Sequence, residues 1–552
     1  MVKRYNADMA SIIAIRTTRV VASWICLTLF GFIGLASSLT VKGQAFPSLI
    51  NATLDDLSSG LADGLFTSVD LVEAYLARIH EVNDTLRAVT ELNPDALAIA
   101  AELDAARANG ISYGALHGIP ILVKNNIATG DSMENTAGSW SLVGAKVPRD
   151  SFVAKKLRCA GAIILGKTNL SQWANYRSEN TSNGWSAHGG QTLGAYYPHQ
   201  DPGGSSSGSG VASSLGLALA ALGTETIGSI ISPAESNNLV GIKPTVGLTS
   251  RHLVIPISEH HDTVGPLART VKDAATILTA IAGVDTQDNY TSAIPNCGVI
   301  PNYAADLQAD ALRGARIGIP YNILPPTNDT PLNTFYAAVD IMREQGAEII
   351  AANVSDPTAP KDFSIMQADF VANLAEYLSE LTHNPHNLTT LSAVRSFTRN
   401  FPTEAYPDRD TAIWDVALEL NYTNTDAFFW DTLQRNRYAG GEAGVLGAMQ
   451  RNDVDALIMP SAYASGWASL VGAPIVTVPL GFYPTDTPVS KTPRGQVLSG
   501  PNIPFGLAFL GPRWSEARLI QLAYAFEQKT AVRDQVQPYL VPKTEIGDIG
   551  GF

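Results

Sequence analysis

Cysteine and charged residues are scarce in this sequence. Only three of its 552 residues are cysteine and no CxxC motif occurs, so a disulfide framework is not expected. Cys159 lies in the apolar run LRCAGAIIL and is predicted to be a packed thiol. Charged residues make up 16% of the chain, whereas typical soluble domains contain about 25%. Together with the 45% hydrophobic content, this scarcity of charge indicates a large buried core.

Positive charge is scarcer still. The formal net charge is -14, and no basic run occurs outside the extreme N-terminus, so nucleic acid is not an expected partner. Neither the adjacent His260 and His261 nor HNPH at 383–386 has the HExxH spacing of a metal site. These histidines are expected in surface or packing roles, and no metal site is predicted.

The N-terminus carries a long uncharged stretch, VVASWICLTLFGFIGLASSLTV, at residues 20–41. Four basic residues precede it: Lys3, Arg4, Arg16 and Arg19. This pattern is typical of a secretory signal peptide, here with a cleavage point before Phe46. The stretch is also long enough for an uncleaved membrane anchor, and an apolar element of the fold is the third interpretation. We predict residues 1–45 to be a signal peptide or an N-terminal membrane anchor, and the protein to be secreted or membrane-anchored in the secretory pathway.

Nine N-x-[ST] sequons agree with a secreted glycoprotein without proving one, since a sequon can be buried. Their asparagines are Asn51, Asn83, Asn169, Asn180, Asn289, Asn328, Asn353, Asn387 and Asn421.

Periodic apolar runs predict an α/β fold. Helical spacing predicts helices over 66–82, 93–110, 151–161, 270–283 and 515–531. The first has an N-cap candidate at Thr67 or Ser68, and the fourth a Thr270/Asp273 capping box. Apolar runs rich in β-branched residues predict buried strands over 118–126, 160–169, 315–320, 455–461 and 473–481. This alternation implies a large mixed or parallel sheet between helices, in one domain over residues 46–552.

Residues 202–214, PGGSSSGSGVASS, have the composition of a linker. They run directly into the apolar segment 215–234, which indicates a buried loop that has a function and not a linker. GSSSG also matches the G-x-S-x-G nucleophile elbow with Ser206 as nucleophile, but the polar, proline-containing residues before it do not read as the strand that an elbow requires. GAIILGKT at 161–168 matches the phosphate-binding GxxxxGK[ST] loop, yet its middle residues read as strand interior, so we interpret it as a buried strand.

Lys124, Ser205 and Ser229 form another candidate constellation. Lys124 ends an apolar strand, Ser205 lies in the Gly/Ser stretch, and Ser229 precedes a helix expected near Pro233. A serine hydroxyl needs an adjacent base to act as a nucleophile, and no histidine is an obvious one. A buried lysine can take that role, because burial lowers its pKa towards neutrality.

These residues lie in motifs that resemble the amidase signature family, serine hydrolases with a Ser–cis-Ser–Lys triad. The resemblance covers nearly the whole chain after the leader and looks closest to the peptide amidases. It implies the amidase signature fold, a large mixed sheet covered by helices on both faces. The motifs include GALHGIPILVKNNI (114–127), TAGS (136–139), GKTNLSQWANYRS (166–178), GGQT (189–192), GGSSSGSG (203–210), GTETIGSI (223–230), VGIKPTVGL (240–248) and DTVGPLART (262–270).

The resemblance implies a role for each triad residue. Lys124 is the base, Ser205 is the bridging serine after a cis Gly204–Ser205 peptide bond, and Ser229 is the nucleophile that forms an acyl-enzyme. The oxyanion would be held by the backbone N–H groups of Thr226, Ile227, Gly228 and Ser229. The products are an acid and ammonia or an amine, and neither a metal nor a cofactor is required.

One position bears on the substrate. Three residues after the nucleophile, some family members carry an arginine that grips a substrate carboxylate, whereas this chain has Ser232. Ser232, with Gly138 and Ser139 of the TAGS motif, is therefore predicted to contact a neutral carboxamide: a C-terminal peptide amide, or an aryl or fatty amide. The segment 285–440 matches the family least and is expected to line the substrate entrance. The protein is expected to act as a monomer or homodimer.

Four positions depart from the family pattern: Asn125, Ile227, Glu235 and Asn238. Asn125 replaces an aspartate beside Lys124, and Asn238 replaces a glycine, a mild change because asparagine visits the αL region. Ile227 is β-branched where a positive φ would be strained, and Glu235 places a carboxylate just past the nucleophile. Two alternatives therefore stay open: a non-catalytic binding relative, and a glutamine-hydrolysing amidotransferase subunit on the same fold.

Overall fold

The computed structural model describes residues 39–41 and 44–549. The apolar stretch of the predicted leader lies mostly outside these residues, so the leader prediction stays a prediction. Within the described part of the chain, no helix is both long and apolar enough to cross a membrane. All the described residues belong to one compact unit. It begins with a short antiparallel pair, β1 (Leu39–Val41) and β2 (Gln44–Phe46).

An 11-stranded sheet runs through this unit. Strand β4 pairs in parallel with β5 and β8, and β11 with β12 and β13, while the other pairings are antiparallel. The predicted mixed sheet is thereby confirmed. In spatial order the strands are β12 (Glu348–Ala351), β11 (Arg316–Ile319), β13 (Ala456–Pro460), β17 (Pro504–Leu510), β14 (Ile475–Phe482), β9 (Val240–Lys243), β10 (Thr263–Ala268), β8 (Ala220–Glu225), β4 (Pro120–Lys124), β5 (Ile163–Thr168) and β3 (Val89–Leu92).

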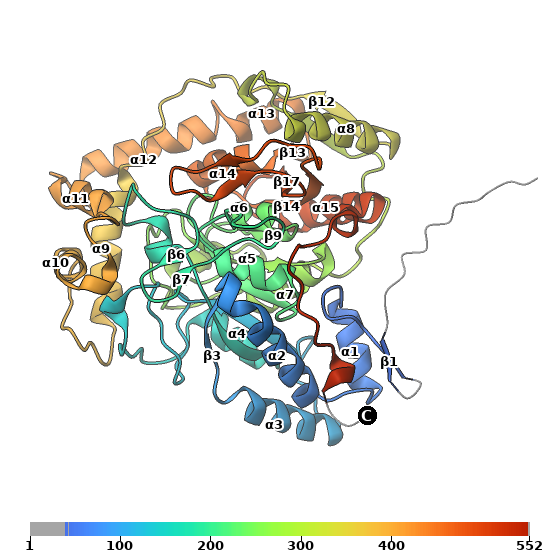
Figure 1. The fold of residues 1–552 in the computed structure, drawn as a ribbon. Coiled ribbons are helices and arrows are strands. Elements are labelled where there is room, and N and C mark those ends of the chain that lie inside the picture. Colours follow the sequence, from blue (N-terminus) through green and yellow to red (C-terminus); the bar gives the residue numbers. More distant parts are fainter. Residues whose placement is uncertain (1–38, 42–43, 550–552) are drawn as a thin grey trace, which may run out of the picture. The chain divides into compact units, whose positions relative to one another are not determined.

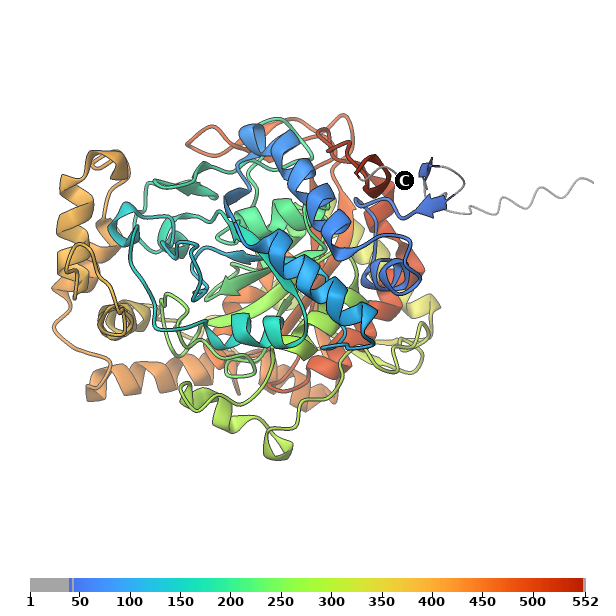
Figure 2. The ribbon, with the colours of Figure 1, turned by 90° about the horizontal axis from the view of Figure 1, so that it is seen from below.

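Helices cover both faces of the sheet (Figures 1 and 2). On one face α7 packs against β9 and β10 and also contacts α4 and α15; on the other, α5 and α6 pack together on the central strands, with α8 beside them on β13 and β14. Because the central strands are covered on both sides, they are buried along their whole length and read as continuous apolar runs. The bounds are α4 (Phe152–Cys159), α5 (Ser207–Ser214), α6 (Ile231–Ser236), α7 (Val271–Ile281), α8 (Thr330–Glu344) and α15 (Glu516–Thr530).

The remaining helices lie around this core. Helices α2 (Ser68–Leu86) and α3 (Ala96–Ala108) pack against each other and follow α1 (Leu54–Ala62) in the sequence. A separate group of helices lies at the left of Figure 1. That group comprises α9 (Ile365–Ser379), α10 (Leu391–Asn400), α11 (Ala412–Glu419) and α12 (Ala427–Gly440). Helices α13 (Val445–Asn452) and α14 (Ser465–Val471) come next in the chain and lie outside this group. Helices α9 to α11 build a second apolar cluster around Phe370 and Trp414, which also contains Trp173 and Ile255 from the body of the fold.

Local predictions were mostly confirmed, with three corrections. Thr67 caps α2 as expected, through a full capping box with Asp70. At α7 only half of the predicted box forms: Thr270 accepts from the Asp273 N–H, but the Asp273 carboxylate accepts from the backbone N–H of Leu54 instead. Cys159 is exposed, not packed, because it is the last residue of α4 and faces outward. The Gly/Ser stretch is a loop only up to Ser206, since residues 207–214 form helix α5.

Candidate active site

Lys124 and Ser205 are hydrogen-bonded in the interior of the protein. Lys124 is the last residue of β4, and both side chains are fully buried. The Lys124 Nζ lies 2.9 Å from the Ser205 Oγ, 2.8 Å from the Thr224 Oγ1 and 3.3 Å from the Thr224 carbonyl oxygen. If the amine directs its N–H groups to the two oxygens of Thr224, its lone pair is left for the hydroxyl proton of Ser205.

Burial lowers the pKa of Lys124 to about 7, and the charges of Asp262 and Glu225 oppose part of this shift. The amine is therefore partly unprotonated near neutral pH, as a general base must be. Two other lysines, Lys167 and Lys243, are equally buried. Lys167, from the GxxxxGK[ST] match, donates to the carbonyl oxygen of Ile127 and to Asn135, and it lies within strand β5. The interpretation of that motif as a buried strand is confirmed.

The Gly/Ser stretch is hydrogen-bonded to the turn that carries Ser229. The peptide bond between Gly204 and Ser205 is cis, as the resemblance implies. The backbone N–H of Ser206 donates to the Ser229 carbonyl oxygen at 3.1 Å, which holds the two loops together. The Ser206 hydroxyl is turned away and donates to the carbonyl oxygen of Thr224. These contacts favour Ser229 over Ser206 as the nucleophile.

Helix α5 is buried along its whole length and contains only Ser, Gly, Ala and one Val. A Cβ atom at Gly208 would collide with the carbonyl oxygen of Ala88 and with the backbone of Asn169. At Gly210 a Cβ would come within 2.8 Å of the Pro233 carbonyl oxygen, in α6. The small residues therefore allow a helix to pack against neighbouring backbone, and the stretch is part of the core.

Ser229 lies in a turn between β8 and α6 and is 7% exposed. Its hydroxyl makes no hydrogen bond with any described residue. The backbone N–H groups of Thr226, Ile227 and Ser229 also have no partner in the described part of the chain, which agrees with a place for an oxyanion. The N–H of Gly228 is not free for this role, because it donates to the Glu225 carboxylate at 2.8 Å. The expectation that Gly228 contributes an oxyanion donor is therefore corrected.

Glu225 organises this turn. Besides Gly228, its carboxylate accepts from the backbone N–H groups of Ile230 and Ile231 at 2.8 and 3.0 Å. On the other side, the Thr226 hydroxyl donates to Asp262 at 2.6 Å. Burial raises the pKa of Asp262 to about 6, against the opposing effect of its hydrogen bonds. The predictions from sequence did not include Glu225, Asp262 or Thr224, although all three lie inside the motifs that carry the resemblance.

The departures from the family pattern are accommodated. The positive φ of the nucleophile turn falls on Gly228 (+84°), not on Ile227, so the expected strain at Ile227 is absent. Ile227 packs against the cluster of Trp173, Phe370 and Trp414. Asn238 adopts φ +58°, as its replacement of a glycine predicts. Asn125 bonds through its amide to Thr136 and Thr90, and so joins the TAGS loop to β4.

Gly138 and Ser139 of the TAGS loop are both buried. The Gly138 N–H donates to the Thr136 hydroxyl, and the Ser139 hydroxyl donates to Glu404 at 2.6 Å. Glu404 also forms a fully buried ion pair with Arg177, with N and O 2.9 Å apart. The polar groups of Gly138 and Ser139 are thus used within the protein, which argues against direct contact of the Ser139 hydroxyl with a substrate.

A cavity of about 320 Å³ is lined in part by Ser232 and Gly203. Ser232 and Glu235 are one helical turn apart in α6, and both contribute to its wall. Two further carboxylates line it, Asp201 and Asp329, while none of the described residues in its wall is a lysine, arginine or histidine. Burial raises the pKa of Glu235 to about 8, and the Gly506 N–H opposes this shift.

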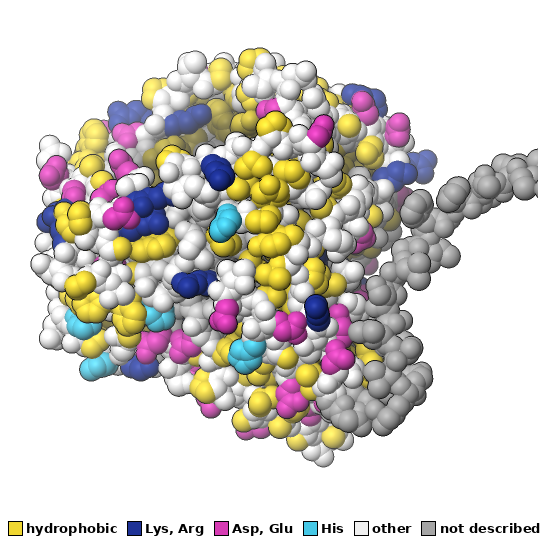
Figure 3. Space-filling model, viewed as in Figure 1, with side chains coloured by type: hydrophobic (Ala, Val, Ile, Leu, Met, Phe, Trp, Pro, Cys, Tyr) yellow, Lys and Arg dark blue, Asp and Glu magenta, His cyan; other side chains and the backbone are white. Residues whose placement is uncertain are grey.

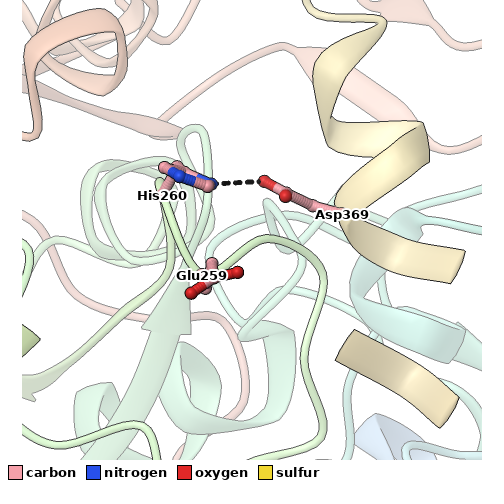
Figure 4. Close-up of side chains that lie close together, drawn as sticks. All are labelled: Glu259, His260 and Asp369. Carbon is pink, nitrogen blue, oxygen red and sulfur yellow. Dashed lines mark hydrogen bonds and ion pairs between the residues drawn. The ribbon is translucent and has the colours of Figure 1, made fainter. Parts of the chain in front are cut away.

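Three side chains of types that can ligate a metal lie close together in Figure 4: Glu259, His260 and Asp369. Their ligand atoms lie within 4.8 Å of one another. Asp369, from α9, is fully buried and accepts from the Ser258 hydroxyl at 2.6 Å, and His260 lies 2.9 Å from the same oxygen. We interpret the cluster as a hydrogen-bonded connection between the 258–262 loop and α9, which agrees with the packing role expected for His260.

Comparison with known proteins agrees with this site. The chain matches the family model described as Amidase over residues 70–466. A protein of Arthroderma benhamiae described as "Putative amidase" is 50% identical over 91% of this chain and 89% of its own. The structure of native peptide amidase from Stenotrophomonas maltophilia has a TM-score of 0.79 and 36% identity, covering 90% of this chain and 99% of that one. The glutamyl-tRNA(Gln) amidotransferase of Pseudomonas entomophila has a subunit that is 32% identical over 87% of this chain and 97% of its own.

Proposed function

This chain belongs to the amidase family and hydrolyses amide bonds, and we propose that its substrates are uncharged carboxamides, which it cleaves through an acyl-enzyme on Ser229. The observation that carries the mechanism is the buried Lys124–Ser205 hydrogen bond of 2.9 Å, with the pKa of Lys124 lowered to about 7. A C-terminal peptide amide, an aryl amide or a fatty amide fits this class.

In the proposed reaction, neutral Lys124 takes the proton of Ser205 while Ser205 takes that of Ser229. The Ser229 oxygen bonds to the carbonyl carbon, and the carbonyl oxygen becomes an oxyanion beside the backbone N–H groups of Thr226, Ile227 and Ser229. The same relay returns the proton to the leaving nitrogen, and the carbon–nitrogen bond breaks. Water then attacks the acyl-enzyme, which releases the acid and restores Ser229.

The charge of the cavity at Ser232 supports the uncharged substrate class. The cavity at Ser232 contains carboxyl groups from Asp201, Glu235 and Asp329, and no basic side chain among the described residues that line it. A substrate carboxylate placed there would lose its hydration without gaining a cationic partner. This arrangement disfavours the α-carboxylate of free glutamine, which weakens the amidotransferase alternative. The non-catalytic alternative loses one of its two motives, since Ile227 is unstrained, and the Lys124–Ser205 hydrogen bond agrees with a proton relay.

The test is ammonia release from an amidated peptide, a benzamide-type amide and free glutamine. We expect release from the uncharged amides, little from glutamine, and none from any of them with Ser229→Ala. Ser206→Ala is the matched control, because this neighbouring hydroxyl donates to a backbone carbonyl, and most of the turnover should remain. Equal loss in both variants, or preferred hydrolysis of glutamine, would contradict the proposal.

Secretion of the protein as a glycoprotein is also part of the proposal. Seven of the nine sequon asparagines have exposed side chains, namely Asn51, Asn180, Asn289, Asn328, Asn353, Asn387 and Asn421. The side chain of Asn83 is bonded to the backbone of Val89, and Asn169 is fully buried. Lys and Arg side chains are scattered among uncharged and acidic ones on the face drawn in Figure 3, and nucleic acid remains an unexpected partner.

A further inference from the structure

The hydroxyl of Ser465 is buried and has no partner among the described residues. Ser465 is the first residue of α14 and is 7% exposed, and its Oγ makes no hydrogen bond within the described chain. Buried hydroxyl groups are normally paired, so each exception calls for an explanation. The other serines of this segment are paired: Ser461 with Thr477 at 2.5 Å, and Ser469 with the Gly466 carbonyl oxygen at 3.1 Å.

Ser465 faces the nucleophile turn. A Cβ atom built on Gly228 would lie 3.9 Å from the Ser465 Cβ and 4.0 Å from its Oγ, with no other described atom outside the turn nearer. A Cβ at Gly228 would thus meet only Ser465 among the described residues outside the turn, at ordinary van der Waals distance, so Ser465 is the side chain that faces this side of Gly228. Gly228 directly precedes Ser229 in the chain, and a substrate group bound beside Gly228 would be within hydrogen-bonding reach of the Ser465 hydroxyl.

The neighbouring donors suggest what that group is. Three N–H groups of the turn, those of Thr226, Ile227 and Ser229, have no partner in the described chain, whereas the Gly228 N–H is held by Glu225. Unpartnered N–H groups next to Gly228 in the chain and the unpartnered hydroxyl that faces it match a ligand that can accept and donate hydrogen bonds. A carboxamide has both a carbonyl oxygen and an N–H group.

We infer that Ser465 is a substrate-binding residue whose hydroxyl hydrogen-bonds to the scissile carboxamide beside Gly228. The inference rests on the proposed function and extends it by a residue outside the triad and the oxyanion turn. Ser465 would orient the amide for attack by Ser229, and orientation of this kind contributes to the rate of an acyl transfer.

The experiment compares Ser465→Ala with Ser465→Thr, which keeps a hydroxyl, and with Ser469→Ala, which removes a paired hydroxyl from the same helix. We expect kcat/KM for an uncharged amide to fall at least tenfold in Ser465→Ala, with an unchanged or higher Tm, because the deleted hydroxyl has no partner to lose. Ser465→Thr should recover part of the activity. Ser469→Ala should leave the activity unchanged while its Tm falls slightly.

A parallel assay on an ester with the same acyl group identifies the atom that Ser465 contacts. Loss on the amide alone indicates a bond to the leaving N–H, and loss on both substrates indicates a bond to the carbonyl oxygen. The inference is overturned if Ser465→Ala keeps the kcat and KM of the unaltered protein, or if its activity and Tm fall together. Absence of amide turnover in the unaltered protein would refute the proposed function itself.

Discussion

The amine of Lys124 and the hydroxyl of Ser205 lie 2.9 Å apart in a fully buried site. They come from segments 81 residues apart in the chain, β4 and the loop that enters α5. No carboxylate pairs directly with the Lys124 amine in the described structure, and the nearest influential charges are Asp262 and Glu225. This isolation allows burial to lower the lysine pKa towards neutrality.

The pH dependence of activity should follow Lys124. Because burial lowers the pKa of Lys124 to about 7, the unprotonated amine that accepts a proton becomes more abundant as the pH rises. We expect kcat/KM for an uncharged amide to increase between about pH 5.5 and about pH 8.5, with a midpoint near this lysine pKa of about 7. Lys124→Arg, which stays protonated, should abolish turnover while preserving the fold by circular dichroism. A flat pH profile would exclude Lys124 as the base.

Removal of the Glu225 carboxylate charge should weaken the nucleophile turn. Glu225→Gln keeps the size of the side chain but can no longer offer two charged oxygens to the N–H groups of Gly228, Ile230 and Ile231. Loss of a charge-assisted hydrogen bond costs about 1.5–3 kcal/mol. We expect kcat to fall more than tenfold with a small change in KM, because the turn holds Ser229 and the oxyanion donors. Glu225→Gln with unaltered kcat would show that the turn is held by other contacts.

The buried ion pair between Arg177 and Glu404 should contribute strongly to stability. Both side chains are nearly inaccessible, and Glu404→Gln would leave the arginine charge buried without its partner. Breaking such a pair costs about 3–5 kcal/mol. The control is Asp408→Asn, which removes the charge of a largely exposed carboxylate from its pair with Arg494, where we expect a clearly smaller loss. Urea denaturation of the two variants checks the difference, and equal midpoints would contradict it.

Glu235 should affect selectivity against anionic substrates at alkaline pH. Its pKa is raised to about 8, so it becomes negatively charged as the pH passes through that value. Asp201, Asp329, Tyr463 and Tyr483 are the other titratable groups lining the cavity. We expect kcat/KM for a carboxylate-bearing amide, relative to an uncharged analogue of equal length, to fall as the pH rises through the Glu235 pKa of about 8. In Glu235→Gln this additional fall should disappear, and its persistence would assign the effect to another group.

Glycosylation should follow the exposure of the sequons. In protein produced by a eukaryotic secretory host, mass spectrometry before and after deglycosylation should place glycans only among the seven exposed asparagines. Asn169 should be unmodified because it is fully buried and bonded to Thr192 and to backbone carbonyl groups. A glycan on Asn169, or the complete absence of glycans, would contradict this part of the proposal.

The sequence was sufficient to propose a candidate triad, because Lys124, Ser205 and Ser229 lie in long motifs whose order resembles one family. It was also sufficient for elements with strong periodicity, such as the predicted helix that became α2 with its cap at Thr67. It was insufficient for α5, since a Gly/Ser composition favours a flexible loop when considered locally. Only the close approach of Ala88, Asn169 and Pro233 explains why these residues form a buried helix.

By itself, therefore, the sequence determined the family and the mixed α/β sheet and identified the candidate residues of the triad, because each depends on local pattern or on motif order. The tertiary structure decided which groups are free to act. It committed the Gly228 N–H to Glu225 and the Ser139 hydroxyl to Glu404, and it left the hydroxyl groups of Ser229 and Ser465 without a partner among the described residues. The physical reason is that these hydrogen bonds depend on which segments the fold brings together, and the local sequence pattern does not predict those contacts.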